Sequence, residues 1–419
     1  MKILKGNLVF APTLGALETI ENGCLILSDD GMIRSVERTV PQGADAQLID
    51  YGSALILPSF VDMHLHAPQY PMLGMGMDLP LIDWLNTYTF QTEARFADHD
   101  YARAIYKKLA GDLITNGTTR VCMFSSLHTD ATLILMEELE RAGVTGYVGK
   151  VNMDRNSIPA LQETTEQSER ETLRWLDSCA RFRYVKPILT PRFTPSCTDA
   201  LMAWLGRLAA ERDLPVQSHL SENLSEIAWV GELHPDCAQY WESYDKYGLW
   251  KPRTVMAHCV HSDAREIEAM HRAGVVVAHC ADSNINLCSG VSPVRRLLRE
   301  GVWVTLGSDI AGGAQLPMYK VITASIRASK FKRIESRWTE DFLTVPEGYY
   351  LGSTSGHRYF GAQGAFAPGD ALHAIVVDDS DFTIPTRPLT LGERFERALY
   401  MMHRHNIVSV WSEGRNVVG

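Results

Sequence analysis

The fold is decided by the stretch Leu57-Pro58-Ser59-Phe60-Val61-Asp62-Met63-His64-Leu65-His66-Ala67-Pro68-Gln69-Tyr70, which begins as an apolar strand and ends in two histidines one residue apart. Side chains two residues apart in a strand point to the same side. We therefore expect the imidazoles of His64 and His66 side by side at one strand end, where both can reach a single ion. Zinc is the metal that most often binds paired imidazoles. Two histidines at a strand end are equally compatible with an ordinary strand terminus, so a metal site depends on further ligands.

Length and composition indicate a large globular enzyme. The chain has 419 residues, 45% of them hydrophobic, which suits a barrel with an appendage. Lys and Arg number 40 against 50 Asp and Glu, a net charge of -10, and no basic run of five or more residues appears, which argues against a nucleic-acid or anionic-membrane surface. No apolar run approaches the roughly 20 residues of a membrane-spanning helix. The eight cysteines are scattered and no signal sequence opens the chain, so we expect a soluble cytoplasmic protein with reduced thiols.

Eight apolar, β-branched runs follow one another, separated by segments with helical spacing. Runs that are apolar on both faces are typical of buried parallel strands. The intervening helices carry their own end signals: before the seventh run, Asp263 with Glu266 resembles a capping box, and Gly274 closes the helix. The sequence therefore predicts a (β/α)₈ TIM-type barrel. The predicted strands are Leu55–His66, Thr118–Phe124, Thr145–Asn152, Val185–Phe193, Pro215–Glu222, Thr254–Val260, Val275–His279 and Trp303–Asp309.

Short strands flank this α/β barrel at both ends of the chain. Residues 1–56 resemble a small β unit, and strand patterns return at Ala374–Val377 and Ile407–Trp411. We expect one small β-sandwich domain built from both termini, with residues 1–56 and 361–419 as its parts and residues 57–360 as the metal-dependent barrel.

The long first connection of the barrel contains Met72, Met75 and Met77. A methionine-rich metal site is one reading of this cluster. Packing in a lid or a dimer-contact loop is favoured, because methionine usually fills irregular gaps between side chains.

Polar side chains gather where the predicted barrel strands end, which is where barrel enzymes place their active sites. Scattered core histidines would not select strand ends so regularly. Three imidazoles and one carboxylate among them form a ligand set for one zinc ion with room for a water molecule. These four residues are His64, His66, His219 and Asp309.

Three of these strand ends also supply groups for proton transfer. Asp309 can accept a proton from the water, and His258 can hydrogen-bond to that water and hold its lone pair toward a substrate. Glu222 can carry a proton from the nucleophile to a ring nitrogen or a leaving amine, although a charge at a helix start is an alternative. We expect His279 to orient a loop or a neighbouring side chain rather than to bind the metal.

The fourth predicted strand ends in Arg192 and Phe193. The guanidinium offers a fixed fork of donors and the phenyl ring a flat apolar surface, so the pair can hold a planar heterocycle by its carbonyl and its face. A structural ion pair of Arg192 is the alternative. Lys186 lies near the start of this strand, so we expect no carbamylated lysine and a single metal ion.

Several motifs carry a resemblance over nearly the whole chain. The general ones are Pro58-x-x-Val61-Asp62-x-His64-x-His66, His219-x-x-Glu222, His258 and Ser308-Asp309, and they resemble the deaminase branch of the amidohydrolase superfamily. The more specific ones are Asp78-Leu79-Pro80-Leu81-Ile82-Asp83-Trp84-Leu85 and Thr190-Pro191-Arg192-Phe193, which are similar to the guanine deaminase family.

This resemblance implies a zinc-dependent hydrolysis of guanine to xanthine and ammonia by a homodimer with one zinc ion per subunit. It implies Glu222 as the proton shuttle. It further implies a purine site that includes Gln69, Arg192 and Phe193, together with the metal ligand His219 and Glu222. A carbonyl at the six position of the purine would accept from Arg192, whereas adenine would present donors there and be rejected.

Two segments depart from the family pattern. The run His279-Cys280-Ala281-Asp282-Ser283-Asn284 stands where the family usually has His-Cys-Pro-x-Ser-Asn, so we expect a looser loop and an additional carboxylate near the site. The segment Gly369–Ala374 lacks the usual aspartate before its alanine.

Two other functions compete with guanine deamination. The same mechanism could act on a pterin, 8-oxoguanine or an aminotriazine. A non-catalytic scaffold with this fold is the third possibility, but such proteins usually lose metal ligands and none is missing here. The signature of the zinc deaminases that act on nucleic-acid bases, His-x-Glu with Pro-Cys-x-x-Cys, is absent from the sequence.

Overall fold

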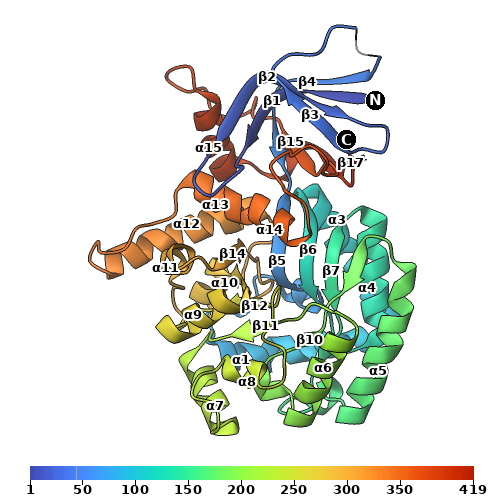
Figure 1. The fold of residues 1–419 in the computed structure, drawn as a ribbon, viewed down its shortest axis with the longest axis vertical. Coiled ribbons are helices and arrows are strands. Elements are labelled where there is room, and N and C mark those ends of the chain that lie inside the picture. The colour runs from blue at the N-terminus through green and yellow to red at the C-terminus, as the bar shows by residue number, and fades with distance from the viewer. Residues whose placement is uncertain (44) are drawn as a thin grey trace.

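Parallel strands form the barrel in the computed structural model, which describes residues 1–43 and 45–419 (Figure 1). The strands pair in the orders β5-β6-β7-β9, β8-β10 and β11-β12-β13-β14, and every pair is parallel. Their bounds are β5 Phe60–His66, β6 Thr118–Phe124, β7 Thr145–Gly149, β8 Val151–Asn152, β9 Val185–Pro187, β10 Thr190–Pro191, β11 Gln217–Leu220, β12 Val255–His258, β13 Val276–His279 and β14 Trp303–Leu306. The predicted α/β barrel class is confirmed.

Backbone hydrogen bonds at two seams join these groups of strands. At the first seam, the N–H of Gln217 donates to the carbonyl of Leu189 at 2.9 Å. At the second, the N–H of Asp309 donates to the carbonyl of His64 at 2.8 Å. The second seam therefore joins two residues of the predicted metal site through their backbones as well as their side chains.

Helices follow the strands and cover the barrel (Figure 1). The predicted end signals of one helix are present: the carboxylate of Asp263 accepts from the backbone of Glu266, and Gly274 ends the helix with a left-handed φ of 70°. The bounds are α1 Leu81–Trp84, α2 Phe90–Ala94, α3 His99–Thr115, α4 Thr129–Ala142, α5 Thr165–Ser178, α6 Asp199–Glu211, α7 Leu224–Leu233, α8 Glu242–Asp245, α9 Ala264–Ala273, α10 Ala281–Asn286, α11 Val294–Arg299, α12 Met318–Glu335, α13 Val345–Gly352, α14 Thr354–Tyr359 and α15 Leu391–Met401.

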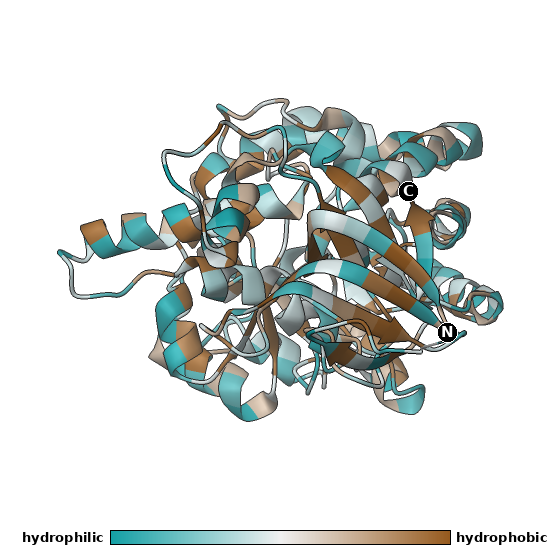
Figure 2. Ribbon diagram, turned by 90° about the horizontal axis from the view of Figure 1, so that it is seen from above, coloured by the Kyte–Doolittle hydropathy of each residue, from teal (hydrophilic) through white to brown (hydrophobic). Residues whose placement is uncertain are grey.

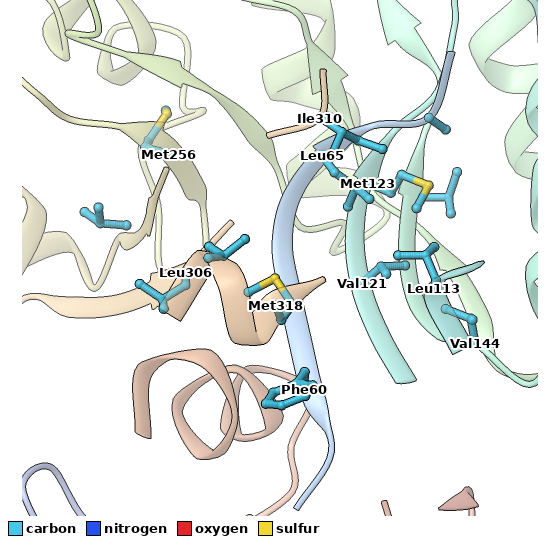
Figure 3. Close-up of a cluster of buried hydrophobic side chains, with 14 of the residues drawn as sticks. Phe60, Leu65, Leu113, Val121, Met123, Val144, Met256, Leu306, Ile310 and Met318 are labelled. Atoms are coloured by element: carbon cyan, nitrogen blue, oxygen red, sulfur yellow. The ribbon is translucent and has the colours of Figure 1, made fainter. Parts of the chain in front are cut away.

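The barrel strands other than β9 are largely buried on both faces, as their continuous apolar runs predict. Val61 and Met63 pack inside the barrel in one cluster, whereas Leu65, Val121 and many others pack with the surrounding helices in a second, larger cluster. Figure 3 shows part of this second cluster around β5 and β6. Figure 2 shows apolar residues concentrated on the strands, with hydrophilic residues frequent on the helices around them.

Both ends of the chain contribute strands to the β domain above the barrel, where both termini lie (Figure 1). Its strands form one sheet of seven, in the order β17-β16-β15-β4-β1-β2-β3, rather than the two separate sheets of a sandwich. The sheet is continuous because β4 pairs with β1 on one side and with β15 on the other. This strand therefore joins the strands from the two chain ends. The bounds are β1 Lys2–Phe10, β2 Glu18–Leu27, β3 Ile33–Glu37, β4 Gln47–Pro58, β15 Ala374–Val377, β16 Ile407–Ser412 and β17 Arg415–Val418.

This sheet has a hydrophobic core of its own, which includes Leu4, Leu25, Ile56 and Trp411. The proposed limits of the domains at residues 56 and 360 stay a prediction. Within the described ranges, no helix is both long enough and apolar enough to cross a lipid bilayer.

Candidate metal centre and active site

A shift in strand register turns the two histidines of β5 toward the other site residues. Val61 and Met63 face the barrel interior, but Leu65 packs with the outer cluster, so the alternation of side chains changes phase between Met63 and Leu65. The pairing of β5 with β6 shifts between Asp62 and Leu65. An irregularity of this kind re-aims side chains next to active sites.

Four predicted ligands meet at this point. The Nε2 atoms of His66 and His219 lie 3.1 Å apart, and Oδ1 of Asp309 lies 3.2 Å from Nε2 of His64 and 3.5 Å from Nε2 of His66. His64, His66 and Asp309 are buried, and His219 is partly buried. Burial lowers the pKa of the three imidazoles, which keeps them in the neutral form that binds a metal ion.

The arrangement of these residues fits a zinc ion. Nε2 of His64 is buried without a hydrogen-bond partner in the described structure, so its lone pair is free. Nδ1 of His219 lies 2.6 Å from the backbone carbonyl of Arg192 and donates its proton there, which leaves Nε2 of His219 free as well. Imidazole nitrogens and carboxylate oxygens are both ligands that zinc sites in proteins use.

The carboxylate of Asp309 is held in its charged form. Burial alone would raise its pKa, but the close approach of His64 and the electrostatic attraction of the nearby imidazoles outweigh burial and hold the pKa of Asp309 well below its usual value. The backbone here is unusual too, because φ is +46° at Asp309 and +73° at His258. Such conformations cost free energy in residues other than glycine and are typical of functional sites.

Glu222 and His258 lie beside the ligand group. Nε2 of His258 is 3.5 Å from Oε2 of Glu222 and 3.8 Å from Oδ2 of Asp309. Burial raises the pKa of Glu222 to about 7, so this carboxyl can both take up and release a proton near neutral pH. Burial acts against protonation of His258, but the charges of Glu222 and Asp309 prevail and raise its pKa.

A pocket lies over these groups, with about 580 Å³ of space between the atoms, part of it open to solvent. Every predicted site residue except the deeply placed His64 lines it. Apolar side chains form much of the remaining wall, and several come from the long first connection of the barrel. The lining residues are His66, Gln69, Leu81, Ile82, Trp84, Leu85, Arg192, Phe193, His219, Glu222, Glu226, Trp229, His258, Leu287 and Asp309.

The methionines of this first connection pack rather than approach the ligand group. Met72 is buried in a small cluster with Trp84 and Leu287, and Met77 lies at its edge. Met75 is 46% exposed. Met72 and Met77 therefore pack as predicted, and none of the three methionines lines the pocket.

Sequence reasoning missed Glu93, although it contacts two predicted substrate residues. The guanidinium of Arg192 donates to both carboxylate oxygens of Glu93, at 2.6 and 3.0 Å, and the amide of Gln69 donates to the same carboxylate at 2.9 Å. The carbonyl oxygen of Gln69 accepts from the backbone of Ala311 at 3.1 Å. No spacing signal in the sequence links Glu93 to these partners. Phe193 lies edge-on to Trp229 at the pocket wall, with ring centroids 6.1 Å apart.

The unusual segment after β13 forms the short helix α10. The carboxylate of Asp282 in this helix accepts from the backbone N–H of Ala314 at 2.8 Å, which joins α10 to the segment that follows β14. The looser loop stays a prediction. Asn284 was also missed: its Oδ1 lies 2.8 Å from Nδ1 of His258 and accepts the ring proton. The sequence did offer a signal for Asn284, because it is the asparagine of the His-Cys-Pro-x-Ser-Asn pattern of the family. His279 lies outside the pocket lining and burial lowers its pKa to about 4, so its orienting role stays a prediction.

Comparisons with known proteins agree with this geometry. A family model described as amidohydrolase family matches residues 55–417. The guanine deaminase of Rattus norvegicus is 36% identical over 439 residues, which span 99% of this chain and 96% of that protein. The guanine deaminase of Dictyostelium discoideum is 34% identical over 442 residues, 100% of this chain and 98% of that protein. A solved guanine deaminase from C. acetobutylicum with guanine bound in its active site is 42% identical, has a TM-score of 0.96 and shares 99% of each chain.

Proposed function

The chain belongs to the amidohydrolase family, and on that premise we propose that it is a guanine deaminase, which converts guanine and water to xanthine and ammonia. The observation that carries this function is the pocket whose lining combines a histidine and aspartate ligand group with a carboxyl poised near neutral pH. The 42% identical structure that holds guanine supports the choice of substrate.

His64, His66, His219 and Asp309 would hold one zinc ion per subunit. When bound, zinc supplies hydroxide near neutral pH by lowering the pKa of a coordinated water. The free lone pair of His64 and the donation from His219 to the carbonyl of Arg192 support this assignment.

Arg192, Gln69 and Phe193 would bind and orient the purine ring. Arg192 donates to the carbonyl at the six position, Gln69 contributes its free amide hydrogen, and Phe193 packs against the ring. Adenine presents an amino group at the six position, which would leave buried donors of Arg192 facing another donor. An unpaired buried donor costs about 1–3 kcal/mol, so adenine is discriminated against.

Proton transfer completes the hydrolysis. Asp309 accepts a proton as water oxygen bonds to C2 of guanine, and His258 holds that water by a hydrogen bond. Glu222 takes one proton from the attacking water and delivers it to the purine ring nitrogen, where it stays in xanthine. The second proton, taken by Asp309, passes on to the amino group, so that both carboxylates return to their starting state. The bond between C2 and the amine breaks, ammonia leaves, and C2 keeps the oxygen as the carbonyl of xanthine. The proximity of Glu222, His258 and Asp309 supports this order of proton movement.

We also propose a homodimer and a cytoplasmic location. The end of α12 projects from the body of the protein in Figures 1 and 2 and carries exposed apolar side chains: Phe331 is 69% exposed and Ile334 is 60% exposed. Contiguous exposed apolar side chains are typical of contact surfaces. All eight cysteines have free thiols, which suits a reducing compartment.

Guanine turnover tests the proposed activity directly. The purified protein should release ammonia and xanthine from guanine, and a panel of a pterin, 8-oxoguanine and an aminotriazine should react far more slowly. Inert guanine beside rapid turnover of one of the others would overturn the substrate, and an inert panel with zinc bound would favour a scaffold.

A further inference from the structure

A buried carboxylate stands behind the substrate wall and has no part in the chemistry above. Glu93 belongs to α2 and is 2% exposed. It does not line the pocket, yet both of its side-chain partners, Arg192 and Gln69, do. These partners come from the end of β10 and from the segment after β5, so Glu93 joins two separate parts of the pocket wall.

The hydrogen bonds of Glu93 fix the directions in which the other N–H groups of Arg192 and Gln69 point. The two terminal nitrogens of Arg192 donate to its two oxygens, which fixes the plane of the guanidinium, and the ring of Phe90 lies 5.7 Å from the guanidinium carbon. The amide of Gln69 is held in one orientation. If it rotated by half a turn, its oxygen would face the Glu93 carboxylate and its N–H groups would face the N–H of Ala311, and both contacts would be repulsive. One donor direction is therefore fixed at each of the two residues.

We propose that Glu93 is a positioning residue that aims Arg192 and Gln69 at the acceptor edge of the purine and so determines selection of the carbonyl at the six position. This inference rests on the proposed guanine deaminase function. It also explains how a buried guanidinium can serve a neutral substrate, because the Glu93 carboxylate neutralises its charge.

An ordinary structural ion pair is the alternative, and the chain offers a matched control for it. The ammonium of Lys150 donates to both oxygens of Glu163 at 2.9 and 3.1 Å, and both side chains are buried. Neither residue lines the pocket. A Glu163→Gln variant therefore loses a buried carboxylate of similar setting without disturbing the substrate wall.

The test compares Glu93→Gln, Glu93→Asp and Glu163→Gln in the zinc-loaded enzyme, with thermal unfolding as a check on folding. We expect Glu93→Gln to raise the KM for guanine by about 10- to 100-fold with a smaller change in kcat, because small misplacements of binding groups have effects of this size. Glu93→Asp should restore part of the loss. Glu163→Gln should change the KM by less than about twofold, since it removes no pocket contact.

Inhibition by 2-aminopurine separates positioning from general damage, because this analogue lacks the carbonyl at the six position. The inhibition constant of 2-aminopurine should change by less than about threefold in Glu93→Gln, since this analogue lacks the carbonyl to which Arg192 donates. Equal weakening of guanine and 2-aminopurine, or an unchanged KM for guanine, would overturn the inference. If Glu93→Gln does not fold, the change in the KM for guanine is compared with the change in the inhibition constant of 2-aminopurine in Glu93→Asp, and that comparison decides. A wild-type protein inert toward guanine would instead refute the proposed function.

Discussion

The Nε2 atoms of His66 and His219 face each other at 3.1 Å, although the two residues are 153 positions apart in the sequence. His219 gives its Nδ1 proton to the carbonyl of Arg192, so its Nε2 atom offers a lone pair. The nearby carboxylate of Asp309 adds negative charge to the same point. Two buried nitrogens and a carboxylate that converge in this way are the environment of a cation.

Removal of the metal should therefore abolish activity and reduce stability. A chelator is expected to eliminate guanine turnover and to lower the midpoint of thermal unfolding, and added zinc should restore both, because the ligands otherwise face one another without a cation. Metal analysis of wild type and His219→Ala gives the stoichiometry, which should fall from one to well below one. Full turnover in metal-free protein would contradict the assignment.

Glu222→Gln should separate proton transfer from metal binding. Glutamine has nearly the same shape as glutamate but cannot carry the proton, so we expect turnover to fall by about 10²- to 10⁴-fold. Zinc content should remain that of wild type, because Glu222 is not among the four ligands. Undiminished kcat would remove Glu222 from the mechanism, and lost zinc would make it a ligand.

Asn284 should support catalysis through His258. Asn284→Ala removes the acceptor that holds the ring proton of His258, and loss of such an orienting hydrogen bond typically costs about 10- to 100-fold in activity. Asn284→Asp keeps an acceptor oxygen at that position and should retain most of the turnover. Equal rates in Asn284→Ala and wild type would show that His258 needs no such support.

The sequence predicted the barrel well because the evidence for each strand is local. Predicted strands were longer than the observed ones where tertiary contacts interrupt them: the run Thr145–Asn152 divides into β7 and β8 at Lys150, whose ammonium is buried against Glu163. The same-side argument for His64 and His66 was sound, but their direction depends on a register shift that no local pattern reveals.

Contacts between distant segments were beyond reach of the sequence. Glu93 lies 99 positions from Arg192, and only the folded chain brings them together. The single seven-stranded sheet was also not predictable, because it depends on β4 pairing with strands from both chain ends. The roles of the site residues stay predictions that the variants above can test.

Glu266 should make the stability depend on pH. Burial of its carboxyl raises the pKa from 4.5 to about 7 and outweighs the hydrogen bonds from Ser262 and Ser221, which act to lower the pKa. The folded state therefore favours the protonated form. Its contribution to the free energy of unfolding is fully present below pH 4.5 and is lost as the pH rises toward 7, on the order of 3 kcal/mol in total.

Glu266→Gln removes this titration. Relative to wild type, the variant should gain stability as the pH is raised from 5 to about 8, as urea unfolding at both values would measure. Glu268→Gln on the same helix changes an exposed side chain and serves as the control. A stability difference between wild type and Glu266→Gln that does not vary with pH would contradict the buried, protonated carboxyl.

The projecting end of α12 should hold the dimer together. Phe331 and Ile334 are exposed there, and Trp338 just beyond the helix is 68% exposed. Burying such side chains against a second copy gives roughly 1.5–3 kcal/mol for each large side chain, so replacing two of them should shift the equilibrium toward monomer. Light scattering with size-exclusion chromatography should show a dimer for wild type and monomer for a Phe331→Ser, Trp338→Ser variant at micromolar concentration. Ile384, 89% exposed on the β domain, provides the control, because Ile384→Ser removes an exposed apolar side chain away from α12. A dimer that survives the double substitution would place the interface elsewhere.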